Sequence, residues 1–236
     1  MKAAGSNVFN KGNNQESPSY EADMSRLKEW FPDLSSSGVF GQLLQFRGLL
    51  DRYNQKLNLV SDRSLQQAAQ IHFADSILGS RLIVERGGVQ GSIYDFGSGN
   101  GFPGIVMGIL YPQLQVRLVD VDVRKCEFLK VVVSTLDLKN VSVINQNVTE
   151  LGPQSVPFAV SRGFANLSRS LLAARKIFSL GGKYFHFKSE EWVREVSEIP
   201  TALCPFWTPE LLGEYQIPGH TGKMFIVKTI RSQRLE

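Results

Sequence analysis

The sequence predicts an α/β protein of Rossmann-like type, with a mostly parallel sheet of seven strands and a small helical unit at its N-terminus. Two observations predict this fold. After Gly87-Gly88, short β-prone runs alternate with helix-prone segments, which is typical of βαβ units on a parallel sheet. In the first unit, residues 92–104 (SIYDFGSGNGFPG) join an apolar run to a helix-prone segment through four closely spaced glycines.

The N-terminal part divides into two segments. Asn, Gly, Ser and Pro dominate its start, so we expect residues 1–20 to be a disordered tail. Residues 21–88 are predicted to form the helical unit. Apolar side chains recur there at three- and four-residue spacing from Phe40 to Leu57, which predicts an amphipathic helix with Ser37 as its N-cap. A second helix is predicted to start near Ser61-Asp62 and to continue through Leu78.

Residues 89–236 are predicted to form the Rossmann-like domain. Strands are expected at 91–96, 114–120, 140–145, 157–161, 183–188, about 213–217 and 223–229. Helices are expected at 103–111, 124–137, 167–180 and 190–197, and Gly181-Gly182 should end the helix over 167–180. Pro218-Gly219 joins the last two strands, so the sheet should end in a hairpin.

Composition indicates an ordinary soluble globular protein, with 236 residues of which 42% are hydrophobic and 20% charged. The net charge of +4 permits a nucleic-acid partner without requiring one. Two cysteines without a C-x-x-C pattern and three histidines favour neither a disulfide framework nor a zinc site. We therefore expect a cytoplasmic protein that has no metal and does not enter a membrane.

The glycine-rich stretch predicts a nucleotide-type cofactor site, because its glycines allow close approach of the backbone to a ligand. Gly99-x-Gly101-x-x-Gly104 also matches the dinucleotide fingerprint of NAD or FAD enzymes. Asp95 argues against that interpretation, since a carboxylate would repel a pyrophosphate. The pattern D-x-G-x-G-x-G, which runs from Asp95 to Gly101, resembles the first motif of class I S-adenosylmethionine methyltransferases. S-adenosyl-L-methionine is therefore the expected cofactor.

Residues after the next two strands would complete an adenosine site. Asp120 ends the second strand, where a carboxylate can accept the hydroxyls of a ribose. Its alternative role is the N-cap of the helix that starts near Arg124. The stretch 147–150 (NVTE) follows the third strand and could recognise the edge of an adenine.

Arg162 and Lys188 end the fourth and fifth strands, at the sheet edge where ligands bind in such folds. Arg162 could meet a phosphate or base of the substrate, or could be a solvated arginine near a helix start. His72 and Asp75 share a helix face at three-residue spacing. For that pair, a packed helix surface and a functional site are equally supported.

Two absent motifs narrow the target. Amino-group methyltransferases tend to have an Asn/Asp-Pro-Pro-aromatic loop after the fourth strand, and cytosine C5 enzymes have a Pro-Cys nucleophile; this sequence has neither. A target that needs no deprotonation is therefore favoured. Guanine N7 is such a target, because its lone pair is already free.

Together these motifs resemble the bacterial 16S rRNA guanine-N7 methyltransferase family, RsmG, also called glucose-inhibited division protein B. The resemblance runs from about Gln42 to Lys228. It is carried by Tyr53-Asn54-x-Lys56-x-Asn58-Leu59, His72-x-x-Asp75-Ser76, Asp95-x-Gly97-Ser98-Gly99-x-Gly101-x-Pro103-Gly104, Val160-Ser161-Arg162-x-Phe164-Ala165-x-Leu167 and Phe187-Lys188.

The resemblance implies a set of cofactor contacts and a set of departures. The implied contacts are Gly97, Phe102, Asp120, Val148, Thr149 and Arg162. Asp95 and Gly99 of the glycine motif are further candidates for cofactor binding. Residues unusual for the family are Asp122, Val123, Asn147, Thr149, Gly163, Ser189 and Lys223.

The implied reaction is in-line methyl transfer to guanine N7 without a general base, with Arg162 and Lys188 as positioning candidates. The target base would be splayed out, with Phe164 as a stacking partner. Candidate contacts to RNA are Phe164, Lys188, Lys223, Lys228 and Arg231. The expected partner is 16S rRNA or the 30S subunit, the protein should be a monomer, and DNA and membranes are not expected partners.

Three alternatives stay open at this point. The dinucleotide fingerprint allows an NAD-dependent enzyme, although no histidine lies in an expected sheet-edge loop for hydride transfer. The changes at Asp122, Gly163 and Ser189 allow a non-catalytic RNA-binding or assembly factor that keeps the fold. A methyltransferase acting on another RNA or on a small molecule is the third.

Overall fold

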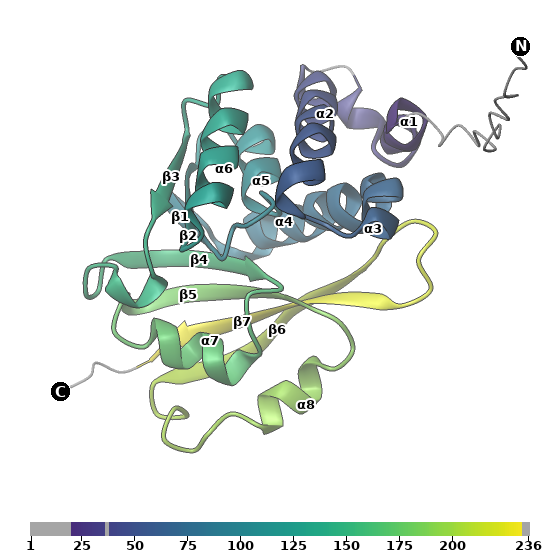
Figure 1. The fold of residues 1–236 in the computed structure, drawn as a ribbon. Coiled ribbons are helices and arrows are strands. Elements are labelled where there is room, and N and C mark those ends of the chain that lie inside the picture. The colour runs from purple at the N-terminus through teal and green to yellow at the C-terminus, as the bar shows by residue number, and fades with distance from the viewer. Residues whose placement is uncertain (1–19, 36–37, 233–236) are drawn as a thin grey trace, which may run out of the picture.

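A computed structural model describes residues 20–35 and 38–232 (Figure 1). Its seven-stranded sheet has the order β3-β2-β1-β4-β5-β7-β6. The first five strands pair in parallel, and β7 runs antiparallel to both β5 and β6. The bounds of the strands are β1 Ser92–Phe96, β2 Gln115–Asp120, β3 Val141–Asn145, β4 Val156–Arg162, β5 Phe178–Lys188, β6 Trp207–Gln216 and β7 Lys223–Arg231. This arrangement confirms the predicted fold class.

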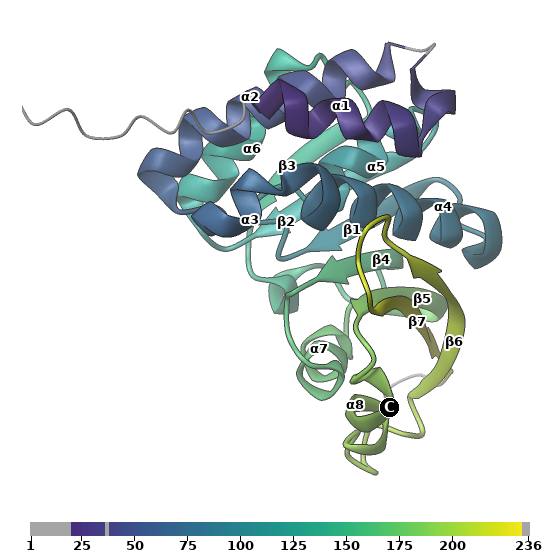
Figure 2. The same cartoon turned by 90° about the vertical axis from the view of Figure 1, so that its right-hand side faces the viewer.

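Helices cover both faces of the sheet (Figure 2). The helices are α1 Tyr20–Trp30, α2 Val39–Leu57, α3 Asp62–Gln66, α4 Asp75–Gly87, α5 Gly104–Leu110, α6 Val123–Thr135, α7 Leu167–Ala174 and α8 Trp192–Ser197. Short 3-10 turns, η1 Pro32–Leu34 and η3 Val148–Glu150, and a π-helix, η2 Ala69–Ala74, complete the described elements.

Alternation of side chains along the strands builds a core on each face of the sheet. On one face, Ile93 of β1 and Phe185 of β5 join the apolar residues of α2, α4, α5 and α6. On the other face, Phe96 of β1 and Tyr184 of β5 pack with Leu171 of α7. Strand β1 is almost wholly buried, as expected for a central parallel strand covered on both sides.

The N-terminal helices belong to the first of these cores. Met24 and Leu27 of α1 are fully buried in the same apolar cluster as Leu50 of α2 and Ile83 of α4. The amphipathic helix predicted from Phe40 to Leu57 corresponds to α2. The predicted tail lies outside the described residues except for Tyr20, which opens α1, and the predicted N-cap Ser37 also lies outside them.

The second predicted helix is not continuous. Between α3 and α4 the chain forms the π-helix η2, and α4 then ends at Gly88 in the left-handed conformation, with φ of +67°. A π-helix widens the turn and is often found at functional sites. Here it brings the Ile71 carbonyl and the His72 and Asp75 side chains to one guanidinium, described below.

The helix predicted over 167–180 is wrong in its second half. α7 ends at Ala174, and Gly181-Gly182 lie inside β5 rather than at a helix end. The reason is tertiary pairing: Val156 N donates to Ile177 O (3.0 Å), and Phe178 pairs with Val156 in the sheet. Ile177 and Phe178 are both buried, so burial and strand pairing outweigh helix propensity at this site.

The C-terminal strands form the predicted hairpin, and β6 starts earlier than expected, at Trp207. The hairpin crosses beside α4 (Figures 1 and 2). None of the helices within residues 20–35 and 38–232 has the length and apolarity that crossing a membrane requires.

Candidate functional site

The glycine turn after β1 is folded back onto β2. Gly97 N and Ser98 N both donate to Val119 O, at 2.9 and 3.1 Å. Gly97 has φ of +69°, and a Cβ there would lie 2.6 Å from Cδ2 of Phe164. Glycine is therefore needed at 97 for two reasons: the backbone has a positive φ, and a side chain would clash with the Phe164 ring.

Asp95 lies beneath this turn and is fully buried. Its Oδ2 accepts a hydrogen bond from Gly104 N at 3.0 Å, and its carbonyl accepts one from the Ser98 hydroxyl at 2.7 Å. Burial raises the pKa of Asp95 to about 7, although the Gly104 hydrogen bond acts in the opposite direction. The carboxylate thus connects β1 with the start of α5 and supports the turn from below.

A cavity of about 360 Å³ opens above the turn, at the carboxyl ends of β1 to β4. Both the glycine turn and the segments after β2, β3 and β4 contribute to its walls. Lining residues include Gly97, Asp120, Lys125, Asn147, Val148 and Phe164. The position is the one where open α/β sheets bind their ligands.

Asp120 connects the glycine turn with the segment that follows β2. Its Oδ2 accepts from Gly99 N at 2.8 Å, and its Oδ1 accepts from Asp122 N at 2.9 Å. The helix cap that was considered for Asp120 is provided by Asp122, which accepts from Arg124 N and Lys125 N. These bonds lower the pKa of the Asp122 carboxyl. Asp120 is therefore free of the capping role and faces the cavity.

The turn η3 forms the third wall. Asn147 Oδ1 accepts from Thr149 N (3.0 Å) and from the Thr149 hydroxyl (2.9 Å), so both side chains are held within the turn. Val148 is 5% exposed and lines the cavity. Thr149 does not line it and borders a neighbouring groove instead.

Arg162 is anchored rather than solvated. Its Nη1 donates to Asp75 Oδ2 (3.0 Å) and to Ile71 O (3.1 Å), and its Nη2 lies 3.0 Å from His72 Nδ1. The guanidinium also lies over the ring of Phe102, 5.3 Å from its centroid. The side chain is 16% exposed. Residues of the π-helix thus fix Arg162 at the end of β4.

His72 takes part as a neutral ring. Burial, together with the charges of Arg162 and Arg47, lowers the pKa of His72 to about 3. An arginine can only donate, so Nδ1 of His72 accepts and the proton lies on Nε2. The imidazole stacks on Phe102 at 5.1 Å between centroids. Phe102 itself is 2% exposed and forms the packed floor beneath Arg162.

Tyr215 on β6 completes this network, and sequence reasoning missed it. Its hydroxyl donates to Asp75 Oδ1 at 2.6 Å. Burial and the Asp75 carboxylate raise the pKa of Tyr215 above its ordinary value. No local motif surrounds Tyr215, and only the long-range course of the hairpin reveals its role.

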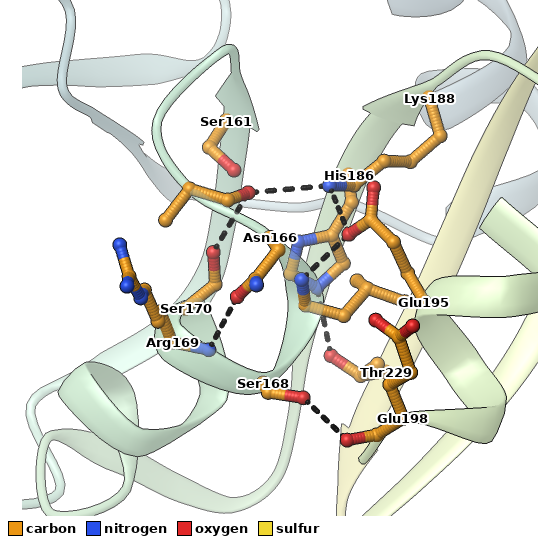
Figure 3. A network of polar contacts seen from close by, with 12 residues as sticks. Ser161, Asn166, Ser168, Arg169, Ser170, His186, Lys188, Glu195, Glu198 and Thr229 are labelled. Atoms are coloured by element: carbon orange, nitrogen blue, oxygen red, sulfur yellow. Dashed lines mark hydrogen bonds and ion pairs between the residues drawn. The ribbon is translucent and has the colours of Figure 1, made fainter. Parts of the chain in front are cut away.

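Lys188 is held by the segment that follows β4 (Figure 3). Its Nζ donates to Glu195 Oε2 at 2.7 Å and to Ala165 O at 3.2 Å. The same Glu195 oxygen accepts a hydrogen bond at 2.7 Å from the backbone N of Leu167, which is the first residue of α7. Lys188 and Glu195 are 12% and 21% exposed. The pair therefore joins β5, α8 and the loop that carries Phe164; sequence reasoning did not find Glu195.

The basic residues of β7 occupy different environments. Lys223 pairs with Glu214, and Lys228 pairs with Glu210 at 2.7 Å. Arg231 is 3% exposed, donates to Phe206 O and lies over the Phe206 and Trp207 rings. Since Lys188 pairs with Phe225 and Lys183 with Ile230, Arg231 lies at the edge of the sheet opposite the cavity.

Two of the residues that are unusual for the resembled family, Asn147 and Gly163, line the cavity. Asp122 caps α6 and Asn147 caps η3. Gly163 has φ of +67°, and a Cβ at this position would meet no other atom within 4 Å. Lys125 lines the cavity, and sequence reasoning missed it although it follows the capping Asp122 by three residues.

Comparisons with known proteins identify relatives of this chain. Residues 40–204 match the family model GidB, described as rRNA small subunit methyltransferase G. A curated relative from Bdellovibrio bacteriovorus, named ribosomal RNA small subunit methyltransferase G 3, is 44% identical over 204 residues, which cover 86% of this chain and 92% of the relative. A relative from Syntrophomonas wolfei, ribosomal RNA small subunit methyltransferase G, is 32% identical and covers 67% of this chain and 74% of its own.

Solved structures support the fold. The 1,6-didemethyltoxoflavin-N1-methyltransferase of Burkholderia thailandensis superposes with a TM-score of 0.54 at 13% identity, covering 78% of this chain and 88% of that one. A putative S-adenosylmethionine-dependent methyltransferase of Methanococcus maripaludis gives 0.51 at 15% identity, covering 80% and 93%.

Proposed function

The chain belongs to the GidB family, the rRNA small subunit methyltransferase G proteins, and from this premise we propose that it methylates N7 of a guanine in 16S rRNA. The activity of this family is S-adenosylmethionine-dependent methylation of rRNA. Membership of the family therefore argues against an NAD-dependent enzyme and against a non-catalytic RNA-binding factor as the main role of this chain. The observation that carries the assignment within the structure is the cavity at the carboxyl ends of β1 to β4.

The residues present fit S-adenosylmethionine. The cavity volume lies within the range of about 300–1,000 Å³ that is usual for small-molecule sites. A carboxylate, Asp120, faces it where a ribose would need acceptors, and the backbone of Gly97 borders it without a side chain. Val148 offers an apolar surface suited to an adenine.

We assign direct contacts with the cofactor to Gly97, Gly99, Asp120 and Val148. Asp95, Phe102 and Thr149 act through the elements they hold, because the first two are buried and the third is turned toward Asn147. Arg162 is a positioning residue whose guanidinium is fixed by Asp75, Ile71 and His72.

The chemistry requires alignment more than proton transfer. When bound, S-adenosylmethionine supplies an electrophilic methyl group on a sulfonium. Guanine N7 carries a free lone pair, so the protein needs no general base and has to place the base in line with that methyl group. Phe164, which is partly exposed beside Gly97, offers a ring for stacking of the target base.

Lys188 positions this ring. Its bonds to Ala165 and Glu195 hold the segment between β4 and α7, so that Phe164 keeps its place over Gly97. We propose that Lys223 and Lys228 contact RNA, with phosphate groups replacing Glu214 and Glu210 as their partners. Arg231 is assigned a packing role, because its guanidinium is buried at the opposite edge.

We further propose that the substrate is 16S rRNA within the 30S subunit or free of it, and that the protein acts as a cytoplasmic monomer. The helical unit over 21–88 would hold the guanidinium of Arg162, and the domain over 89–236 would bind cofactor and base.

The experiment that tests the proposal is transfer of a labelled methyl group from S-adenosylmethionine to free 16S rRNA and to 30S subunits, with the product nucleoside identified by mass spectrometry. The expected product is 7-methylguanosine on one of the two substrates. Another methylated nucleoside would overturn the N7 assignment. Absence of transfer to both, with cofactor binding intact by calorimetry, would overturn the substrate.

A further inference from the structure

A groove separate from the cofactor cavity runs along α7. Two adjoining hollows of about 440 Å³ each share the same helix surface, and we call them together the α7 groove. Helix α7, which borders both hollows, lies on the sheet face opposite α4, α5 and α6 (Figures 1 and 2). Nothing in the mechanism above uses it.

Three cations border the α7 groove: Arg169, Arg175 and Lys176. All three side chains are exposed. Within residues 20–35 and 38–232, none of them forms an ion pair, and no carboxylate-bearing residue lines either hollow. In Figure 3 the guanidinium of Arg169 points away from the polar network around Lys188. By contrast, Lys188, Lys223 and Lys228 are each neutralised by a glutamate.

The floor of the groove is apolar. Leu172, on the outer side of α7, is 49% exposed, and Phe206 stands across the groove from it as a partly exposed ring. An apolar floor between cations suits a ligand with flat faces and a charged backbone, as in single-stranded nucleic acids. An acidic peptide would match the cations equally well, but would be separate from the reaction.

The groove and the cofactor cavity border the same short turn, η3. Val148 lines the cavity and Thr149, the next residue, lines the groove. Arg169 and Arg175 are six residues apart, so they are separated by about 9 Å along a helix axis. That distance corresponds to about three stacked nucleotides. A strand that enters the cavity can therefore lie along α7.

We propose that the α7 groove binds the single-stranded rRNA segment next to the target nucleotide, with phosphates on Arg169, Arg175 and Lys176 and bases against Leu172 and Phe206. This rests on the proposed function. It adds a binding site for the nucleic acid outside the cavity, which explains how affinity can be gained where the cations at the sheet edge are already paired.

The test compares the full-length double variant R175E/K176E with the matched double variant K130E/K139E. Lys130 and Lys139 are exposed and lie on and just beyond α6, away from the groove. The probe is a fluorescein-labelled oligouridine of about 12 nucleotides, followed by anisotropy at several salt concentrations. We expect R175E/K176E to bind at least about tenfold more weakly than the control, with a salt slope smaller by about 1.4.

Cofactor binding and methyl transfer separate this inference from the proposed function. R175E/K176E should bind S-adenosylmethionine like the wild type in calorimetry and require more 16S rRNA for half-maximal methyl transfer. If the wild type methylates 16S rRNA and both variants bind oligouridine alike, the groove assignment is overturned while the function stands. If R175E/K176E loses binding to 30S subunits but not to oligouridine, the groove contacts another part of the subunit than a single strand, and the inference is likewise overturned. If the wild type transfers no methyl group to rRNA, the proposed function itself fails.

Discussion

Arg162 and Asp75 form an ion pair between residues 87 positions apart in the sequence, with Nη1 3.0 Å from Oδ2. Asp75 is 4% exposed by its side chain and Arg162 16%. The pair connects the end of β4 with the start of α4. It therefore links the sheet edge that borders the cavity to the N-terminal helices.

Asp75→Ala should destabilise the fold. Removing one partner of a largely buried pair leaves an uncompensated charge, at a cost of about 3 kcal/mol. Asp33→Ala is the control, because it breaks the exposed Arg81–Asp33 pair, which should contribute less than about 1 kcal/mol. Urea unfolding followed by circular dichroism measures both. Equal midpoints for the two variants would show that the Arg162–Asp75 pair does not hold the fold.

Arg162→Lys should keep the fold and lose most of the turnover. A lysine keeps the charge, but a point ammonium cannot reproduce the planar fork that meets Asp75, Ile71 and His72 together. We expect at least about a tenfold fall in kcat, of the size that misplaced positioning groups cause. Unfolding should shift by less than in Asp75→Ala. Wild-type turnover in Arg162→Lys would remove this residue from the site.

Asp120→Ala should weaken cofactor binding. The carboxylate lines the cavity and accepts from Gly99 N, so both a ligand acceptor and the shape of the glycine turn are lost. We expect at least about a tenfold rise in the dissociation constant of S-adenosylhomocysteine by calorimetry, which corresponds to about 1.4 kcal/mol. Asp122→Ala is the control on the neighbouring carboxylate, which caps α6. Similar affinities for the two variants would contradict the assignment of Asp120.

The neutral state of His72 makes stability depend on pH. Its pKa is about 3 in the folded protein and about 6.5 when unfolded, so only the unfolded chain binds this proton between those values. Stability should therefore fall as the pH drops below about 6.5, by about 1.4 kcal/mol per pH unit from this residue. His72→Gln, which retains an acceptor for Arg162, should show a shallower fall between about pH 6.5 and 5. Identical pH profiles in urea unfolding would argue against a neutral buried His72.

Glu195→Gln should lower turnover without weakening cofactor binding. Glutamine can still accept from Leu167 N, but it loses the charge that holds Lys188. The loop carrying Phe164 is then less well fixed, so kcat for 16S rRNA should fall while the affinity for S-adenosylhomocysteine stays. Glu198→Gln, which alters only the exposed Arg194 pair, is the control. A change in cofactor affinity alone would assign Glu195 to the cavity instead.

The fold was predictable because its signals are local. Each parallel strand is a short apolar run, and the glycine turn at 97–104 identifies the first βα unit. The error at 175–180 arose because pairing of Phe178 with Val156 is a long-range contact that no window of sequence contains. Tyr215 escaped prediction for the same reason, since its partner Asp75 lies 140 residues away.

The site was predictable to the extent that its residues end strands. Asp120 and Arg162 were found because they close β2 and β4. The burial of Arg231 was not predicted from the sequence. Side chains of β7 alternate between the two faces of the sheet, and Arg231, its last residue, packs against the Phe206 and Trp207 rings. Residue type and spacing gave no sign of which basic residues would be paired.

The contact of the C-terminal hairpin with the N-terminal helices can form only late in translation. The Tyr215 hydroxyl completes the set of partners around Asp75, and Gln70 Nε2 donates to Pro218 O at 2.7 Å. A ribosome makes Tyr215 and Pro218 after the glycine turn, the cavity walls and Arg162 have been synthesised. A nascent chain that stops before β6 thus holds every proposed cofactor contact, yet it leaves β5 as an open sheet edge and Asp75 without its tyrosine. Completion of the site is therefore a late event of translation.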